Sequence, residues 1–262
     1  MKIKNYLLNE IDRCGTIHMT LLDPDKLSLE EFVKLAKMAE NYGSSALMVG
    51  GSLGVSSNLL DNYLKEVKSE LTIPIILFPG SVAGLSQYAD AVWFLSVLNS
   101  TDPYFIIGAQ TQAAIMIAKR FKNLEPISLA YIIIGDGGCV GYVSYARPIP
   151  YDKVEIMIAY ALAAQYLGFD FIYLEAGSGA KEPIPPENVS KIRRVISKPL
   201  IIGGGIREPE IAYKIAKAGA DIIVTGTIIE KSPEVLKKII EAVKNGGKDK
   251  VVNRKTTLIT EI

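Results

Sequence analysis

The sequence has few of the residues that most metal centres and disulfide frameworks use. Of its 262 residues, only two are cysteine and only one is histidine. Cys14 and Cys139 lie far apart and belong to no CxxC pair, so a disulfide framework is not expected and a reducing cytosol fits. A zinc site has no ligands to draw on, because His18 lies inside an apolar run. We interpret His18 as a core residue with a satisfied hydrogen-bond partner.

An excess of one charge and a long hydrophobic run are also missing. Lysine plus arginine (29) nearly balances aspartate plus glutamate (28), and no basic stripe stands out, which disfavours a nucleic-acid partner. The longest apolar helical stretch, residues 104–118, contains three polar residues at 110–112 and is too short to span a bilayer. Residues 1–13 resemble an amphipathic helix and not a signal peptide. We therefore expect a cytoplasmic protein without a transmembrane segment.

Apolar residues make up 49% of the sequence, and many of them gather in short runs rich in β-branched side chains. Eight such runs occur, at 16–22, 45–49, 74–78, 91–95, 128–134, 171–174, 200–202 and 222–224. Helical periodicity marks most segments between them, at 29–41, 58–71, 103–120, 152–167, 186–196, 209–218 and 233–244. Strands that are apolar on both faces and alternate with helices form a parallel sheet covered by helices. Eight of them predict an α/β fold, a closed (β/α)8 TIM-type barrel.

Two parts of the chain depart from this repeat. Between Phe78 and Ala91 only a dozen residues remain, so we expect the third helical unit to be reduced to a turn. That would leave an apolar slot in the helical layer, filled by a neighbouring subunit or by a long apolar ligand. The stretch after Lys244 begins too polar to be core, and we expect it to fray or to dock on a partner. No linker divides the chain, so residues 1–262 are expected to form a single barrel domain.

Glycine-containing turns follow the last three predicted strands. They lie at 176–179, 203–205 and 226, and in a TIM barrel these carboxyl ends form the rim that holds the active site. Glycine turns in this place commonly bind a phosphate monoester through backbone N–H groups. Any one of them alone is better explained as a tight turn. Three in register favour a phosphate site.

Polar side chains occur at the ends of other predicted strands. Asp23 follows the first strand and is a candidate Mg²⁺ ligand, because this ion takes one or two protein oxygens plus ligand phosphates. Ser52 follows the second strand and offers a hydroxyl. The alternatives are that Asp23 caps a turn before Pro24 and that Ser52 caps a helix. We interpret Asp25 and Lys26 as part of a solvated turn.

The sixth strand ends in a phenol and a carboxylate on one face. Tyr173 and Glu175 alternate with Ile172 and Leu174, so they point to the same side of the strand. Glu175 is a candidate base for a hydroxyl nucleophile, or it holds that hydroxyl by a hydrogen bond. Tyr173 either takes part in the site or fills the barrel.

These strand ends together resemble one known family. LDPDK (22–26), VGGS (49–52), YLEAGSGA (173–180), GGGIR (203–207) and TGT (225–227) are similar to motifs of geranylgeranylglyceryl phosphate synthases, as are LNSTDPYFIIGAQ (98–110) and ARPIP (146–150). The resemblance covers most of the chain in order. Leu21 stands where the bacterial branch carries a lysine, which favours the archaeal branch.

The resemblance implies a Mg²⁺-dependent prenyltransferase barrel. Such an enzyme joins the C20 group of geranylgeranyl diphosphate to sn-glycerol 1-phosphate, the first ether bond of archaeal membrane phospholipids. It implies that Asp23 and Ser52 bind Mg²⁺, that Tyr173 and Glu175 act in catalysis, and that the protein is a homo-oligomer. It also implies a glycerol 1-phosphate site formed by Tyr173, Leu174, Glu175, Ala176, Gly177, Ser178, Gly179, Gly204, Gly205, Gly226 and Thr227.

Two other classes of function remain open from the residues. Another phosphate-handling biosynthetic barrel is one, although such enzymes usually place a lysine or paired carboxylates inside the mouth, and Asp23 and Glu175 come without an interior lysine. A non-catalytic barrel that binds a phosphorylated metabolite is the other. It would keep the glycine turns and would not need Asp23 as a metal ligand.

Overall fold

Eight parallel strands close into a barrel in the order in which they occur along the chain. The computed structural model describes residues 2–51 and 56–260. The strands are β1 (Ile17–Leu22), β2 (Ala46–Val49), β3 (Ile75–Leu77), β4 (Ala91–Val97), β5 (Glu125–Ile133), β6 (Phe171–Glu175), β7 (Leu200–Gly203) and β8 (Ile222–Thr225). Every neighbouring pair is parallel, including β8 with β1. This confirms the predicted (β/α)8 barrel.

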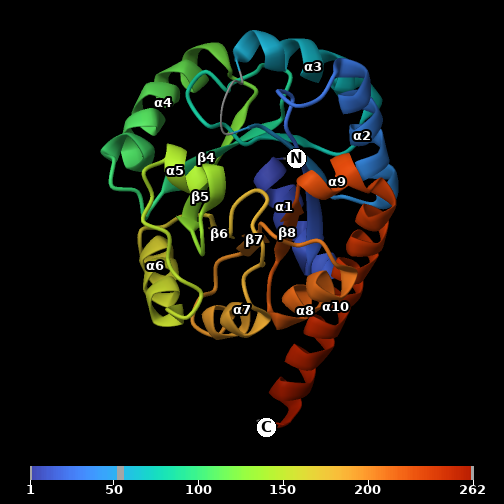
Figure 1. Ribbon diagram of the computed structural model, residues 1–262, viewed down its shortest axis with the longest axis vertical. Helices are drawn as coiled ribbons and strands as arrows, with labels where there is room; N and C mark the ends of the chain where they lie inside the picture. Colours follow the sequence, from blue (N-terminus) through green and yellow to red (C-terminus); the bar gives the residue numbers. More distant parts are fainter. Residues whose placement is uncertain (1, 52–55, 261–262) are drawn as a thin grey trace.

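Helices form a ring around the barrel (Figure 1). They are α1 (Ile3–Cys14), α2 (Leu29–Tyr42), α3 (Ser57–Glu70), the π-helical turn η1 (Tyr104–Gly108), α4 (Ala109–Arg120), α5 (Gly138–Val143), α6 (Val154–Tyr166), α7 (Pro186–Arg193), α8 (Pro209–Ala218), α9 (Thr227–Lys231) and α10 (Pro233–Thr260). Local signals fix where several begin. Ser28 and Glu31 form a capping box before α2, and proline occupies the first turn of α7 and α8. In the described ranges, no helix has both the length and the apolarity that crossing a bilayer requires.

Alternate side chains on each strand pack into two different cores. On β6, Phe171 and Tyr173 lie inside the barrel with Met19 and Trp93, whereas Leu174 points outward into the layer between sheet and helices. This alternation follows from the period of two along a strand. His18 faces outward on β1, and its Nδ1 and Nε2 lie 2.9 Å from the hydroxyls of Ser44 and Thr225. The interpretation of His18 as a satisfied core residue is confirmed.

The third unit lacks a helix, as expected, and a loop takes the place of that helix. A loop, residues 78–90, joins β3 to β4. Its Leu85 and Ala89 are 2% and 6% exposed and pack in one cluster with Leu64 of α3 and Ile117 of α4. The slot itself, and its filling by a partner or a ligand, stays a prediction. A turn without regular structure has enough apolar side chains to cover the short strand β3.

The expectation that the stretch after Lys244 is too polar for the core and frays is wrong, because α10 continues through it to Thr260. Docking of this stretch on a partner stays a prediction. Gly246 and Gly247 allow close packing: a Cβ on Gly247 would lie 2.5 Å from the backbone nitrogen of Thr16. Lys250 is only 4% exposed and donates to Asp221 at 2.9 Å. A polar sequence is thus buried here by backbone contact and by an ion pair.

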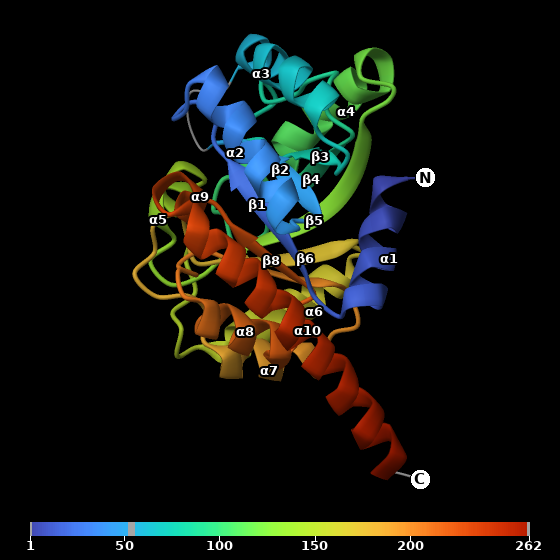
Figure 2. The same cartoon turned by 90° about the vertical axis from the view of Figure 1, so that its right-hand side faces the viewer.

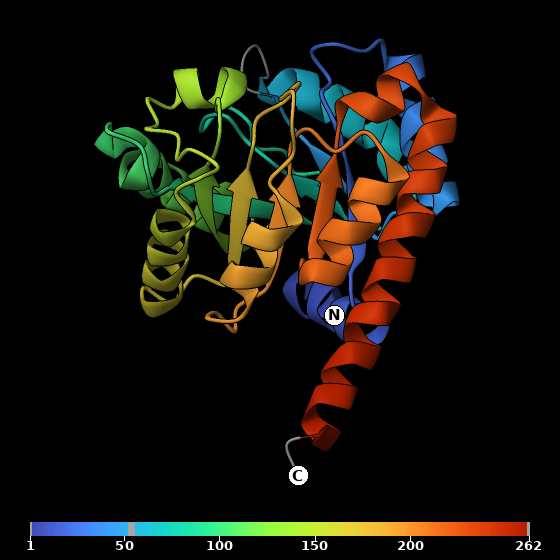
Figure 3. The same ribbon diagram turned by 60° about the horizontal axis from the view of Figure 1, so that its bottom comes forward.

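The two ends of the barrel differ in what covers them. The short helices α5 and α9 stand at the carboxyl ends of the strands, and α1 lies across the opposite end (Figure 2). Figure 3 shows the same separation from another side, with the N-terminus and the far end of α10 away from the strand tips. Leu7 and Ile11 of α1 are buried and belong to the core inside the barrel. The fold thereby presents the carboxyl ends as the accessible rim.

Candidate active site

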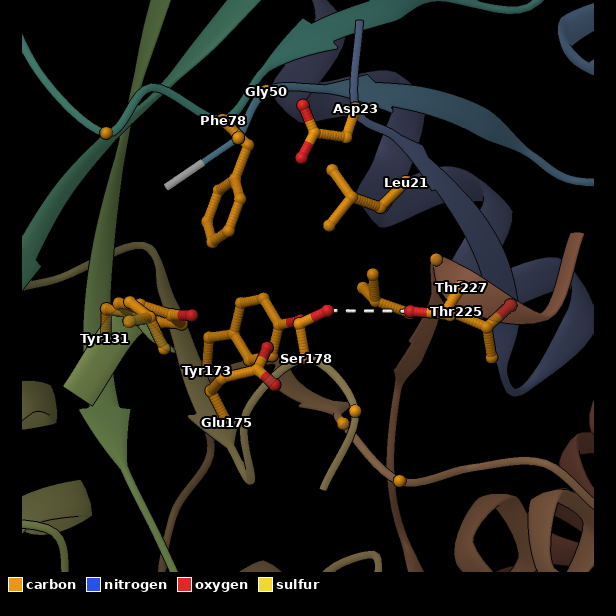
Figure 4. Close-up of a pocket in the computed structure, with 18 of the residues that line it drawn as sticks. Leu21, Asp23, Gly50, Phe78, Tyr131, Tyr173, Glu175, Ser178, Thr225 and Thr227 are labelled. Atoms are coloured by element: carbon orange, nitrogen blue, oxygen red, sulfur yellow. Dashed lines mark hydrogen bonds between the residues drawn. The ribbon is translucent and has the colours of Figure 1, made fainter. Parts of the chain in front are cut away.

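A cavity of about 310 Å³ opens at the carboxyl ends of the strands. Residues that follow β1, β2, β3, β6, β7 and β8 line it, together with the ends of β4 and β5 and residues of η1, α5 and α9. Segments far apart in the sequence therefore meet at one place, which is where TIM barrels carry their active sites. In the close-up, Leu21, Asp23 and Phe78 lie across the cavity from Tyr173, Glu175 and Ser178 (Figure 4).

The three glycine turns predicted to converge do share this cavity. Ser178 and Gly179, Gly204 and Gly205, and Gly226 and Thr227 all line it, and we refer to these six residues as the turn wall. The Ser178 and Thr227 hydroxyls lie 3.5 Å apart and link the turns after β6 and β8 (Figure 4). Arg207 donates to backbone carbonyls of residues 179, 180 and 181, which ties the turn after β7 to the turn after β6. The three turns are thus held as one unit.

Glycine is needed in the turn wall for both conformation and space. Gly204 has a φ of 86°, a conformation that disfavours residues with a Cβ. A Cβ on Gly204 would also lie 2.6 Å from the Glu175 Oε1. In the neighbouring Gly203, a Cβ would meet the Tyr173 hydroxyl. The glycines therefore leave room for the two polar side chains at the end of β6.

Three residues of the predicted glycerol phosphate site do not line the cavity. Leu174 and Ala176 are fully buried in the outer core. Gly177 packs against the backbone of Gly137 and Gly138, and its N–H donates to the Glu175 carboxylate at 2.7 Å. Of the run 173–179, only Tyr173, Glu175 and the two turn-wall residues face the cavity. Leu174, Ala176 and Gly177 therefore support the site by packing behind the residues that line the cavity.

Glu175 is a buried carboxylate with three donors around it. It is 6% exposed, and burial raises its pKa above the usual value. Hydrogen bonds from the Tyr173 hydroxyl, the Gly177 amide and the Tyr131 hydroxyl oppose this rise in the pKa. Burial and the nearby Glu175 charge raise the pKa of both tyrosines well above 10, so they stay protonated and donate. Such a carboxylate is suited to hold a hydroxyl or to accept its proton.

An aromatic cluster extends from Tyr173 across the barrel. The rings of Phe78 and Tyr173 stack with centroids 5.8 Å apart, and Tyr131 meets both rings edge-on. Beside this cluster, apolar side chains from the β3–β5 side and the helices above it line the cavity. We refer to them as the apolar wall: Phe78, Leu95, Val97, Phe105, Val140 and Val143.

Asp23 lies at the mouth, where both of its carboxylate oxygens have partners. Its Oδ2 lies 2.9 Å from the Lys26 ammonium, and its Oδ1 accepts the Asp25 N–H at 3.2 Å. The carboxylate sits over Gly51, where a Cβ would come within 2.5 Å of it. The hydrogen bond from the Asp25 N–H is the contact expected if Asp23 caps a turn, which was the alternative interpretation of this residue. Ser52 lies outside the described residues.

Sequence reasoning missed several residues that line the cavity, among them Phe78, Phe105, Tyr131 and Lys26. In the sequence, the three aromatic residues lie in apolar runs, and Lys26 belongs to a predicted surface turn. The register offers a signal for one of them: Tyr131 pairs with Tyr173, so the two phenols stand side by side on the inner face. Phe78 comes directly after a strand end, which is the other usable signal.

By sequence and by structure, this chain is similar to one family of known proteins. Residues 9–246 match the PcrB family. The geranylgeranylglyceryl phosphate synthase of Caldivirga maquilingensis is 58% identical over 97% of this chain and 96% of the relative. That of Thermofilum pendens is 53% identical over 94% and 96%. The crystal structure of (S)-3-O-geranylgeranylglyceryl phosphate synthase from Thermoplasma acidophilum, in complex with its substrate sn-glycerol-1-phosphate, matches with a TM-score of 0.89, 40% identity, and coverage of 93% of this chain and 99% of that one.

Proposed function

Because this chain belongs to the PcrB family, we propose that it joins the geranylgeranyl group of geranylgeranyl diphosphate to the 3-hydroxyl of sn-glycerol 1-phosphate and releases diphosphate. This is the first ether bond of archaeal membrane phospholipids. The observation that carries the proposal is that one cavity has a turn wall suited to a phosphate monoester and an apolar wall suited to a prenyl chain. Few other reactions need both in one place.

The turn wall binds the phosphate of sn-glycerol 1-phosphate in this proposal. Glycine turns bring backbone N–H groups to an anion without side chains in the way. The hydroxyls of Ser178 and Thr227 lie on the same wall and add donors. With its phosphate held there, the glycerol moiety extends toward Glu175, which lies between the turn wall and the aromatic cluster. Holding two reactants in this way accounts for roughly 7–11 kcal/mol of barrier in well-aligned cases.

Asp23 fits the role of a Mg²⁺ ligand. Within the described part of the chain, no group of three or more acidic, histidine or cysteine side chains gathers that could hold a metal ion, but Mg²⁺ needs only one or two carboxylates when substrate phosphates complete its coordination. The Asp23 carboxylate lies at the mouth and is already within reach of one cation, the Lys26 ammonium. Ser52 would be the second ligand. Bound there, Mg²⁺ supplies positive charge to the departing diphosphate.

The transfer breaks the bond between the prenyl C1 and the diphosphate oxygen and forms a bond from C1 to the glycerol oxygen. Glu175 orients the attacking hydroxyl and takes its proton, while the electron pair of the broken bond leaves with diphosphate. The apolar wall and the aromatic cluster hold the prenyl chain and keep water from the developing positive charge at C1. Burial contributes about 0.8 kcal/mol for each CH₂ group.

One incubation series tests the proposal. The purified protein is mixed with sn-glycerol 1-phosphate or sn-glycerol 3-phosphate and with prenyl diphosphates of several lengths, with and without Mg²⁺, and lipid products are extracted. We expect a C20 ether product from sn-glycerol 1-phosphate only, and only with Mg²⁺. A protein that binds glycerol phosphate yet forms no ether with any prenyl diphosphate would instead be a phosphate-binding barrel of another function.

Assembly and location complete the proposal. Several large apolar side chains are exposed on the chain, among them Ile107, Ile115, Tyr142 and Tyr145 on or beside η1, α4 and α5. This exposure supports a homo-oligomer, which light scattering on the purified protein measures directly. We infer a cytoplasmic enzyme, which cell fractionation tests; a peripheral, salt-sensitive membrane fraction would show contact with the bilayer that receives the product.

A further inference from the structure

Lys26 is the lysine whose ammonium reaches the Asp23 side of the cavity. It lines the cavity, and its side chain is 56% exposed, so its end can move while the turn that carries it stays fixed. That turn is held by the Lys26 N–H, which donates to the Asp23 carbonyl at 3.2 Å. Because its side chain is largely exposed, Lys26 is a cation at neutral pH, as an ordinary lysine is.

The pair formed by Lys26 and Asp23 conflicts with a divalent cation at the same carboxylate. Both carboxylate oxygens already have partners, so a metal ion has to compete with them for the carboxylate. Two cations close together also repel each other. The ammonium is the partner that leaves more easily, because a partly exposed ion pair contributes at most about 1 kcal/mol. Its long side chain then remains at the mouth with its charge unpaired.

The other cations of the rim are placed differently. Arg207 donates to three backbone carbonyls of the turn after β6, so its guanidinium is engaged in holding the turn wall. Lys231 ends α9 and also lines the cavity, but the ammonium that pairs with Asp23 is that of Lys26. A diphosphate bound by a single Mg²⁺ at Asp23 keeps a surplus of negative charge. Lys26 is the cation next to that position.

We infer that Lys26 is a catalytic residue of the transfer: it neutralises Asp23 while the cavity is free of substrate, and it moves to the departing diphosphate when a divalent cation takes the carboxylate. The inference rests on the proposed function. Lys26 keeps its proton throughout and exchanges no group with the substrate. Its role is to neutralise charge that increases as the bond to C1 breaks, which lowers the barrier.

Two binding measurements test Lys26 without relying on turnover. Calorimetric titration of the substrate-free protein with Mn²⁺ or Mg²⁺ should show Lys26→Met binding the cation about two- to fivefold more tightly, because the competing ammonium is gone. Titration with inorganic diphosphate at saturating Mg²⁺ should show about tenfold weaker binding for the same variant. Lys26→Arg, which keeps the charge, should recover most of the diphosphate affinity.

Lys37→Met is the matched control. Lys37 forms an ion pair with Glu70 between α2 and α3, with a similarly exposed side chain, and lies outside the cavity. It should change neither titration. Unchanged or weaker cation binding by Lys26→Met would overturn the competition, and unchanged diphosphate binding would overturn the catalytic role. If the wild-type protein forms no ether product, the proposed function fails; if it does and Lys26→Met still binds both ligands like wild type, only the role of Lys26 fails.

Discussion

The turn wall and the apolar wall line one cavity but are built by different means. The turn wall is built largely from backbone, and its glycines come from three consecutive β/α units. The apolar wall is built from side chains of β4, η1 and α5 and of the residue directly after β3. Under the proposed function, charge is bound by a compact local motif, whereas an apolar chain is bound by surface area that many elements contribute. The predictions below test whether the walls act separately.

Asp23→Asn should have the largest effect, because it removes the charge that is proposed to hold Mg²⁺ and leaves the turn wall intact. We expect transfer to fall about 10³-fold or more, since a metal contributes several kcal/mol of charge stabilisation. Binding of sn-glycerol 1-phosphate, measured by calorimetry, should remain within a few-fold of wild type. Asp25→Asn is the control, because it removes a neighbouring exposed carboxylate that is not engaged with Lys26. Unchanged turnover in Asp23→Asn would exclude the metal role.

Glu175→Gln should lower kcat about a hundredfold. Burial raises the pKa of Glu175, so wild-type kcat should fall as the pH is lowered through a value above that of an ordinary carboxyl, because the base must be ionised. This acid limb should disappear in the variant. The same raised pKa means that the wild-type free energy of unfolding decreases as the pH rises from the unfolded to the folded pKa. If only the KM for glycerol phosphate changes, Glu175 positions the substrate and is not a base.

Gly204→Ala should disable the turn wall selectively. The new Cβ would press on Glu175 and on the Gly177 nitrogen, so affinity for sn-glycerol 1-phosphate should fall by about tenfold or more, while the KM for prenyl diphosphate changes little. Gly168→Ala is a close control: Gly168 has a φ of 87°, nearly that of Gly204, but no atom lies within 4 Å of the position that the new methyl group would take. It should lower thermal stability alone. Equal losses of affinity in both variants would argue against a local effect on the wall.

Phe78→Leu should have the smallest effect and act on the other wall. Its ring contacts Tyr131 and Tyr173, and such aromatic pairs contribute about 0.5–1.5 kcal/mol each. The KM for prenyl diphosphate should rise about two- to tenfold, with affinity for glycerol phosphate unchanged in the same assay. Phe32→Leu, which removes a ring packed edge-on against Tyr63 in the helical layer, should leave both constants unchanged. A rise in both constants for Phe78→Leu would mean that the walls are coupled.

The barrel and the turn wall could be predicted from the sequence because each depends on a short-range pattern. Apolar runs of strand length alternate with helical periods, and the three glycine turns follow three strands directly. A closed parallel barrel then fixes that these ends meet on one rim, whatever lies between them. Asp23 was identified for the same reason, since it follows the first strand.

The apolar wall and the packing of α10 could not be predicted in this way. Phe105 and Tyr131 look like core residues in the sequence, because only the closed barrel decides which inner side chains reach its open end. Glycines usually weaken a helix, but here Gly246 packs against α8 and Gly247 against the segment between α1 and β1, both distant in the sequence. Lys250 likewise needs Asp221 to be buried. Such features depend on contacts between residues that are distant in the sequence, not on local sequence patterns.

The helix that lies across the amino-terminal end of the barrel also has a kinetic consequence. Because α1 inserts Leu7 and Ile11 into the inner core, substrates and products enter and leave the described cavity through its mouth at the carboxyl ends of the strands. The polar and the apolar substrate use the same opening, and the apolar ether product has to leave through it as well. The turnover rate then depends on the order in which substrates bind and products are released. A detergent or membrane that takes up the ether at the mouth should raise this rate without altering the bond-forming step.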